Sequence, residues 1–432
     1  LDFGGWVVDT PGSGRTWPDP VVADVNGAGQ LEVVAAHSGG YVSVRKADGT
    51  SIAGWPQQVT PGNELRSLAV GDVDDDGDLE IAVASTRSDN QWFVLEHTGA
   101  TRAGWPKQTD SDTTGYAAGC FNQNVGLGDI DGDGKLELVG PNDTHYVSAF
   151  RNDGTAVRAN SMFGQIGGLN KVWARVGFHY SQTVDLRGYA NCTAGREPLE
   201  PRPNFANSAP TMADVDGDGT LEIIIVGNQY DCRADPYASL FDSPYILRAD
   251  RTRWAADGFD WTNLPVPDGA AAPLSEDYSL VETAEPNPVV ADLDGDGRKE
   301  ILYASYDGRL HAYWLDRTEH GSWPFRVTRS GDGYIRFGSP PAVVDLDNDG
   351  LAEVILTTWT QKGSNAGGQL LILSWDGRQL QAVDLPRSSQ TWDGAMAAPT
   401  VADIDGDPEL EVVVGTAHTG LVAYDLPGSS GA

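Results

Sequence analysis

Cysteine, methionine and basic residues are all scarce in this chain of 432 residues. It has three cysteines and three methionines, and 29 Lys and Arg stand against 62 Asp and Glu, for a net charge of −33. Nucleic acids and anionic membrane surfaces are bound through cationic patches, so this charge excludes nucleic-acid binding as a main activity. No apolar run approaches the roughly 20 residues that a transmembrane helix needs, so no transmembrane segment is expected.

Signals for catalysis are also missing. With three cysteines and seven scattered histidines, a zinc site is not expected. The sequence contains no Gly-x-Ser-x-Gly nucleophile elbow, no His-Glu-x-x-His pair and no phosphate loop. These absences favour a binding protein and leave enzyme activity open.

Glycine is abundant, with 52 residues, and one acidic motif occurs seven times. The copies occupy residues 23–32, 71–80, 128–137, 213–222, 291–300, 344–353 and 402–411. Counted from its first aspartate, the complete motif has Asp at positions 1, 3 and 5, Gly at position 6 and Glu at position 9. Such internal repetition indicates one architecture built from repeated units.

Each copy lies in the same frame of four short strands. A short stretch precedes the motif, a β-branched apolar run follows it, and a third strand ends near an Asp-Gly turn. A fourth strand begins with Gly-Trp-Pro or Ser-Trp-Pro at Trp55, Trp105 and Trp323, whose indoles we expect to pack between blades. Four strands repeated seven times predict an all-β, seven-bladed β-propeller with four-stranded antiparallel blades, forming a single domain over residues 1–432.

The two ends of the chain complement each other. The last repeat stops after its third strand, and the first residues, Gly-Gly-Trp-Val-Val, match the missing fourth strand. We therefore expect residues 1–10 to complete the last blade, which would remove an open sheet edge.

The motif itself predicts a calcium loop. Carboxylates at alternate positions converge on one ion as the chain curls around it, and Gly at position 6 permits the positive φ that this turn needs. An EF-hand is excluded, because position 12 is not acidic and a strand rather than a helix follows.

These repeats resemble the FG-GAP/VCBS repeat family, the integrin-α type of seven-bladed propeller. The resemblance covers nearly the whole chain. It implies that each calcium loop joins the first and second strands of a blade, on the face opposite the usual ligand face. Copies two to six are complete, whereas Asn26 and Ala28 replace acids in copy one and Pro408 replaces the turn glycine in copy seven. The expected cofactor is calcium, structural in role, at five complete sites and two incomplete ones.

The expected ligands are the acids at positions 1, 3, 5 and 9 and the backbone carbonyl at position 7. They are Asp72, Asp74, Asp76, Asp78 and Glu80; Asp129, Asp131, Asp133, Lys135 and Glu137; Asp214, Asp216, Asp218, Thr220 and Glu222; Asp292, Asp294, Asp296, Arg298 and Glu300; Asp345, Asp347, Asp349, Leu351 and Glu353; with Asp24, Asn26 and Glu32 in copy one and Asp403, Asp405, Asp407, Glu409 and Glu411 in copy seven.

Two insertions, at about residues 160–207 and 228–287, fall where the non-calcium face is expected. Cys192 lies in the first and Cys232 in an adjacent loop, so we expect a Cys192–Cys232 disulfide, with Cys120 left as a thiol. Elaborated loops on a rigid scaffold commonly carry binding sites. The candidate ligand contacts are Trp173, His179, Tyr180, Arg187, Tyr230 and Arg233; alternatively, the aromatic side chains pack the loops.

These features predict a secreted or cell-surface protein, monomeric, that binds a glycan or an extracellular protein. The alternative is a carbohydrate-active enzyme such as a polysaccharide lyase with its site in the same funnel. A lyase would require His179, Tyr180 or Arg187 to act as a base beside a calcium-bound uronate. A third interpretation is an accessory propeller of a larger secreted enzyme.

Overall fold

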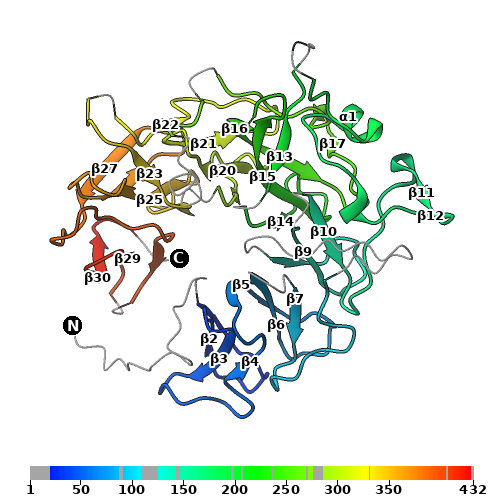
Figure 1. The fold of residues 1–432 in the computed structure, drawn as a ribbon. Coiled ribbons are helices and arrows are strands. Elements are labelled where there is room, and N and C mark those ends of the chain that lie inside the picture. The colour runs from blue at the N-terminus through cyan, green and yellow to red at the C-terminus, as the bar shows by residue number, and fades with distance from the viewer. Residues whose placement is uncertain are drawn as a thin grey trace.

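Apart from two short two-stranded ribbons, the strands form seven antiparallel sheets that follow one another around a ring (Figure 1). In this computed structural model, the described residues are 20–86, 91–108, 125–142, 146–193, 195, 199–205, 208–235, 237–268, 271–275, 286–329, 331–404 and 407–429. All statements about the fold refer to these residues.

Each sheet is one blade, and the blades are numbered in chain order. Blade one contains β1 (Val21–Ala23), β2 (Glu32–Ala36), β3 (Tyr41–Lys46) and β4 (Gln57–Gln58). Blade two contains β5 (Glu64–Gly71), β6 (Glu80–Thr86) and β7 (Trp92–Leu95), and blade three contains β8 (Gly126–Gly128), β9 (Glu137–Pro141) and β10 (Val147–Phe150). Blade four contains β13 (Arg202–Asn204), β14 (Thr211–Ala213), β15 (Glu222–Asp231) and β16 (Ala238–Leu247).

The remaining blades follow the same plan. Blade five contains β19 (Val289–Ala291), β20 (Glu300–Ala304), β21 (Arg309–Tyr313) and β22 (Phe325–Arg326). Blade six contains β23 (Arg336–Gly338), β24 (Ala342–Val344), β25 (Glu353–Thr360), β26 (Gln369–Leu373) and β27 (Gln379–Asp384). Blade seven contains β28 (Thr400–Ala402), β29 (Leu410–Thr416) and β30 (Gly420–Leu426).

Every acidic motif joins two neighbouring strands in one register. The residue before the first aspartate pairs with the glutamate at position 9, as in Ala23↔Glu32, Gly71↔Glu80 and Ala402↔Glu411. The pairing recurs in all seven blades. All seven motifs therefore lie at the same end of their blades, and the hairpins between second and third strands point to the opposite end.

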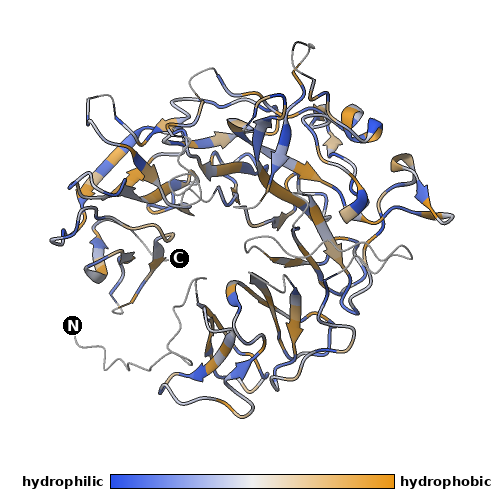
Figure 2. Cartoon of the chain, viewed as in Figure 1, coloured by the Kyte–Doolittle hydropathy of each residue, from blue (hydrophilic) through white to orange (hydrophobic). Residues whose placement is uncertain are grey.

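The core lies between adjacent blades. Buried Leu302 and Leu310 of blade five, for example, pack in one cluster with Val354 and Leu371 of blade six. Strands β9 and β20 are buried along their whole length, and apolar colour predominates in many of the strands of Figure 2, because neighbouring blades pack against both faces. This packing explains why the apolar runs after each motif are nearly continuous.

The first insertion holds most of the irregular structure. It contains η2 (Ser161–Phe163), β11 (Gln165–Ile166), β12 (Leu169–Asn170), η3 (Trp173–Arg175) and α1 (Gln182–Arg187), and a further ribbon of β17 (Ala255–Ala256) and β18 (Phe259–Asp260) extends blade four. The predicted all-β, seven-bladed propeller is confirmed, with one short helix added. The strand predicted from residues 1–10 and the thiol of Cys120 lie outside the described residues.

Candidate functional site

The acidic motifs of blades two to six each bring three carboxylates together. In each group one oxygen per residue lies within 4.8 Å of the others. The groups are Asp72, Asp74 and Glu80; Asp129, Asp131 and Glu137; Asp214, Asp216 and Asp218; Asp292, Asp294 and Glu300; and Asp345, Asp347 and Glu353. These five acidic clusters could hold metal ions.

The backbone of each loop is curled by its own first aspartate. Asp72 accepts hydrogen bonds from the backbone N–H groups of Asp76 and Gly77, at 3.1 and 3.0 Å. Gly77 has a φ of 95°, which only glycine adopts without strain, and the position-6 glycines of the other complete copies behave alike. Position 6 is therefore glycine for the reason that the sequence predicted.

The glutamate at position 9 ties the loop to the sheet. In all seven copies its carboxylate accepts a hydrogen bond from the backbone N–H at position 2, at 2.7–3.2 Å. Burial raises the pKa of Glu80, Glu137 and Glu222 to about 7 and that of Glu300 to about 8. Burial also raises the pKa of Glu353. A buried carboxylate of this kind favours a bound proton or a bound cation.

A cation fits the loop of blade two by its polar atoms. Oδ1 of Asp74 and Oε1 of Glu80 are buried and have no hydrogen-bond partner among the described residues. Glu80 itself is fully buried, so bulk solvent does not reach this oxygen. The donors are all carboxylate oxygens, which suit a hard divalent ion such as calcium or magnesium.

The position-5 acids accept a hydrogen bond from the position-7 N–H of their own loops, as Asp76 does from Asp78, Asp218 from Thr220 and Asp349 from Leu351. Among the five clusters, that of blade four includes its position-5 acid, Asp218. Ligation by the position-5 acids and by the position-7 carbonyls of Asp78, Lys135, Thr220, Arg298, Leu351 and Glu409 stays a prediction.

Copy one keeps the turn, and neither copy one nor copy seven forms such a cluster among the described residues. Asp24 still accepts from the N–H groups of Ala28 and Gly29, so the first loop has the same curl without a position-5 acid. In copy seven, Asp405 lies outside the described residues, while the Glu411 carboxylate makes the same bond to Ile404 at 2.7 Å. Metal binding at both copies stays a prediction.

Two of the five clusters also contain a guanidinium group. Arg102 binds Asp74 at 2.7 Å and Glu96 at 3.1 Å, and its side chain is 13% exposed. Arg151 binds Asp131 in blade three. In blade five the corresponding Oδ2 of Asp294 accepts from the indole N–H of Trp314 at 2.9 Å. These partners lie outside the acidic motif, in the segment that follows the third strand of each blade.

The opposite end of blades three and four carries the stapled insertion. A disulfide joins Cys192 to Cys232 at the β15–β16 hairpin, the pairing expected from the sequence. Arg187, at the end of α1, forms an ion pair with Glu200 and donates to the backbone carbonyl of Tyr189. This ion pair lies within the insertion and joins α1 to the segment that leads into β13.

A cluster of buried charged side chains around Asp185 holds α1 in place. Asp185 accepts from Arg253 at 2.8 Å and from Arg251 at 3.3 Å, and it lies 3.2 Å from Nδ1 of His179. Burial alone would raise the pKa of Asp185, but Arg253, Arg251 and His179 hold it below its usual range. These groups are wholly buried, so their role in this structure is to hold the insertion.

Two of the six predicted ligand contacts are core residues. Trp173 is fully buried and donates its indole N–H to the carbonyl of Ala249, and His179 is 1% exposed. Both therefore pack the insertion and present no surface to a ligand. Their burial agrees with the alternative that the side chains of the long loop pack its interior.

The other four predicted contacts lie nearer the surface but are already engaged. Tyr180 packs on the core cluster of blades three and four, and Tyr230 is the penultimate residue of β15. Arg187 forms an ion pair with Glu200, and Arg233 forms one with Asp231 at 3.0 Å. Two aromatic side chains that were not in the predicted set are much more exposed. Tyr189 is 63% and Tyr237 is 57% exposed, and each is within five positions of a disulfide cysteine.

Comparison with known proteins agrees with this geometry. A family model described as FG-GAP-like repeat matches residues 24–83, 72–140 and 292–356. The chain carries FG-GAP-like repeats, and its fold is consistent with the integrin-type FG-GAP propeller.

Two curated relatives match most of the chain. Cartilage acidic protein 1 of Mus musculus is 25% identical over 395 residues, covering 80% of this chain and 56% of that protein. Its Homo sapiens counterpart is 24% identical and covers 80% and 55%. The chain therefore spans about half the length of the curated relatives it matches.

Solved structures resemble the chain in fold alone. A crystal structure of BBS1N in complex with ARL6DN gives a TM-score of 0.49 at 10% identity, covering 95% of this chain and 92% of that one. BamB from Moraxella catarrhalis gives 0.47 at 12% identity, covering 96% and 86%. Within the described residues, no helix has the length and apolar character needed to cross a membrane.

Proposed function

We propose that this chain is an extracellular, calcium-stabilised β-propeller that binds a carbohydrate or protein ligand on the face opposite its metal loops. The observation that carries the proposal is the one-sided elaboration of the ring. One end of the blades holds repeated acidic loops, whereas the other end carries an insertion fixed by the Cys192–Cys232 disulfide. A scaffold that is regular on one face and elaborated on the other is typical of binding proteins.

The disulfide supports an extracellular location. Disulfides persist in oxidising compartments and are rare in the cytosol of most organisms. The relatives are named for cartilage, a tissue rich in extracellular matrix, which fits the same location. Their ligands are not transferred to this chain.

Calcium is the ion proposed for the five clusters, because carboxylate and carbonyl oxygens in a flexible loop suit its larger coordination number better than magnesium's strict octahedron. Asp72, Asp74 and Glu80 would hold it in blade two, and the equivalent residues would do so in blades three to six. The ion would neutralise mutually repelling acids. Its proposed role is therefore to stabilise the fold.

The proposed ligand surface, called the insertion patch, consists of Leu186, Arg187, Tyr189, Arg233 and Tyr237. Its members come from α1, the strand-free segment after it and the β15–β16 hairpin, which the disulfide holds together. Leu186 is 42% exposed, and the Arg187 guanidinium stacks over the Tyr189 ring at 4.6 Å. Exposed tyrosines beside arginine suit sugar rings and peptide backbones.

The test is a binding screen with variants of the patch. Neutral and acidic glycans and extracellular matrix proteins would be arrayed against the parent, Tyr189→Ala, Tyr237→Ala and Leu169→Ala. Leu169 is 47% exposed on β12, in the same insertion but outside the patch, so it is the matched control. Both tyrosine variants should weaken binding about tenfold or more, with calcium-dependent melting unchanged.

Equal binding by the tyrosine variants and the parent would reject the patch. The same screen includes acidic polysaccharides followed for unsaturated products, so that product formation would favour the lyase alternative. The lyase receives less support here, because His179 is buried against Asp185 and offers no accessible base.

A further inference from the structure

Copy one of the acidic motif has an asparagine at position 3, Asn26, and the next residue is Gly27. The chain contains no second Asn-Gly pair. Asparagine is a thermolabile residue, and a following glycine makes it more so, because the backbone nitrogen of a residue without a side chain reaches the neighbouring amide carbon easily. In the other six copies position 3 is an aspartate, the residue that deamidation of Asn26 leaves: Asp74, Asp131, Asp216, Asp294, Asp347 and Asp405.

The loop of copy one already has the conformation of the complete copies. Oδ1 of Asn26 accepts the backbone N–H of Ala28 at 3.0 Å, and Asp216 and Asp294 make the same bond from position 3 to position 5 at 3.3 Å. The Glu32 carboxylate accepts the N–H at position 2 at 3.0 Å, as the glutamate at position 9 does in blade two. The amide of Asn26 therefore lies where complete copies hold a carboxylate.

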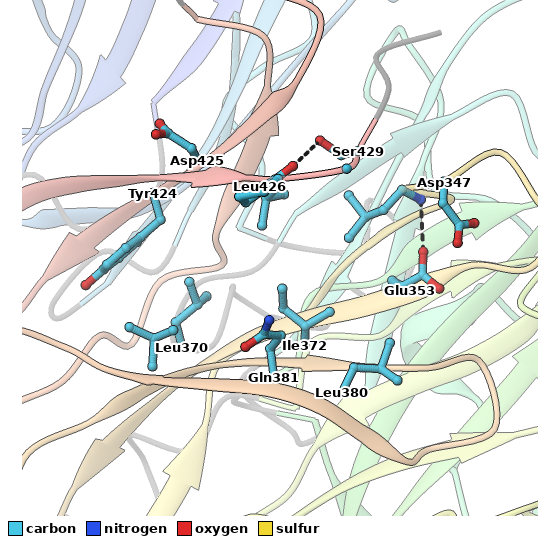
Figure 3. A pocket seen from close by; sticks show the side chains of 14 residues that line it. Asp347, Glu353, Leu370, Ile372, Leu380, Gln381, Tyr424, Asp425, Leu426 and Ser429 are labelled. Atoms are coloured by element: carbon cyan, nitrogen blue, oxygen red, sulfur yellow. Dashed lines mark hydrogen bonds between the residues drawn. The ribbon is translucent and has the colours of Figure 1, made fainter.

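Figure 3 shows what a complete copy holds at the equivalent positions. In blade six, Asp347 at position 3 lies beside Glu353 at position 9, whose carboxylate accepts the N–H of Leu346 at 2.9 Å. The clusters of blades two, three, five and six all consist of the acids at positions 1, 3 and 9. Copy one has acids at positions 1 and 9, Asp24 and Glu32, so it differs from this set by one amide group.

The groups that react in deamidation are unengaged in this loop. Among the described residues, no hydrogen bond involves the backbone N–H of Gly27 or the side-chain nitrogen of Asn26, and Gly27 is exposed. In blades three to five the glycine N–H at the same position donates to the first aspartate of its loop at 2.7 Å. The bond from Ala28 to Oδ1 of Asn26 polarises the amide carbonyl, which makes its carbon a better electrophile.

We propose that Asn26 is a site of spontaneous deamidation, and that the aspartate it leaves gives copy one the carboxylate set of blades two, three, five and six. The backbone nitrogen of Gly27 bonds to Cγ of Asn26, the Cγ–Nδ2 bond breaks, and the amide nitrogen leaves as ammonia with the proton of the Gly27 N–H. Water then opens the five-membered imide at Cγ, which restores that N–H and leaves a carboxyl group. One water is consumed and one ammonia is released, with no change of oxidation state.

The loop directs where the imide opens. The N–H of Ala28 that polarises Cγ in the amide also polarises it in the imide, so water adds at that carbon and the main chain is kept. Addition at the backbone carbonyl would instead give isoaspartate, with an extra methylene in the main chain. We expect aspartate to be the main product in the folded protein.

The expected consequence is tighter calcium binding at copy one, and this half of the inference rests on the calcium role proposed above. The amide oxygen of Asn26 is itself a possible calcium ligand, so the unmodified loop is a weak site. A carboxylate at the same place adds a negative charge beside the ion, and the charge of the ligands tunes calcium affinity in such loops.

The deamidation is tested by mass spectrometry of the peptide that contains residue 26, with fragmentation that distinguishes aspartate from isoaspartate. The folded protein would be compared when freshly purified and after weeks at physiological temperature and pH, beside Asn26→Gln. We expect the parent to convert to aspartate and Asn26→Gln to remain an amide. Asn348, at position 4 of copy six, is the reference within the chain, because the N–H of Asp349 after it is bonded to Asp345 at 3.1 Å.

The metal half is tested by hydrogen exchange of residues 23–32 as calcium is added. The aged parent and Asn26→Asp should become protected at about tenfold lower calcium than the fresh parent. The matched control is Asn348→Asp, which adds the same charge at a position outside the clusters. Asp75 occupies that position in copy two with a φ of 62°, against 57° for Asn348, so the change fits the loop. It should leave the calcium response of residues 344–353 unchanged.

Two results overturn the proposal while the calcium proposal stands. The first is an aged, folded protein in which residue 26 is still an amide or has become mainly isoaspartate. The second is Asn26→Asp with the calcium response of the fresh parent in residues 23–32, while the loops of blades two to six respond to calcium. If no loop responds to calcium, the calcium proposal fails and the metal half of this inference fails with it.

Discussion

The loops of blades two and three differ from those of blades four and six in one respect. Arg102 and Arg151 each bind the position-3 aspartate, so the first two loops contain a positive charge of their own. Among the described residues, no Arg or Lys forms an ion pair with Asp214, Asp216 or Asp218 in blade four, or with Asp345, Asp347 or Glu353 in blade six. The same motif thus occurs in two charge environments, with a guanidinium on its position-3 aspartate in blades two and three and without one in blades four and six.

Because of this difference, we expect the stability of each loop to depend on metal to a different degree, although all the loops share one motif. A loop with its own cation has less mutual repulsion when the metal is absent. The cost is repulsion between the guanidinium and a dication that binds beside it. We therefore expect blades four and six to depend most on metal and blades two and three to depend least.

Removing the metal should produce the largest effect. Excess EDTA should lower the melting temperature by about 10 °C or more, because each occupied site adds about 2.7 kcal/mol when the free ion is at a hundred times its dissociation constant. Calcium added back should restore it. Hydrogen exchange in EDTA should rise first in residues 213–222 and 344–353, and later in residues 71–80 and 128–137.

Melting that ignores EDTA, with no metal found by elemental analysis, would contradict the calcium proposal. If hydrogen exchange in EDTA rises equally in all loops, the calcium proposal stands, but the predicted difference between blades is wrong. The two results are separable, because melting reports the whole ring and exchange reports each loop.

Replacing one guanidinium should produce a smaller effect of opposite sign in the two states. Arg102→Gln leaves Asp74 without its partner, so melting in EDTA should fall by a few degrees. In calcium, the loss of a nearby positive charge should tighten one site by about fivefold to tenfold, or about 1–1.4 kcal/mol. Isothermal titration with calcium measures this, and terbium luminescence provides an independent reading.

Arg298→Gln is the matched control for that variant. Arg298 also changes the charge of a loop, but it lies 3.8 Å from Asp296 and both side chains are nearly half exposed, so solvent screens the pair. It should change neither melting nor affinity appreciably. Weaker calcium binding by Arg102→Gln would mean that Arg102 positions Asp74 for the ion, which would reverse our interpretation of its role.

The features that could be predicted from the sequence are those that recur at fixed spacing in every complete repeat. Asp72 and Glu80 recur with their spacing in every complete copy, and the local turn chemistry of Gly77 fixes how they meet. Arg102 and Arg151 could not be found in this way, because they reach the loop from the segment after the third strand, whose sequence varies between blades. Their role depends on how two parts of a blade pack together.

Trp173 shows the same limit. Three tryptophans, Trp55, Trp105 and Trp323, each precede a proline, and this pattern predicts them to be packing residues. Trp173 and Trp261 also donate their indole N–H to a backbone carbonyl of the next blade, as the other three do. No proline follows them, so nothing adjacent in sequence indicates that they are core residues. The exposed Tyr189 and Tyr237 were passed over for the converse reason, since exposure in an insertion is decided by tertiary packing.

The dependence on pH should give the smallest effect, and its sign should differ between the metal-free and the calcium-bound protein. Burial raises the pKa of Glu80, Glu137 and Glu222 to about 7 and of Glu300 to about 8, so the metal-free fold binds protons that the unfolded chain releases near pH 4.5. Their contribution is fully present below pH 4.5 and is lost as the pH rises through 7 and 8. The melting temperature in EDTA should therefore fall by a few degrees between pH 5 and pH 8.

In calcium the trend should reverse over the same range, because the ion displaces these protons and its affinity rises as they leave. Glu300→Gln removes the glutamate whose pKa is the highest of the four and should flatten the metal-free slope above pH 7. In calcium the variant has one site fewer, so its melting temperature should rise less with pH than that of the parent. A metal-free melting temperature that rises from pH 5 to pH 8 would show that these carboxyls ionise without penalty, and that the loops are neutralised by something other than a proton or a divalent ion.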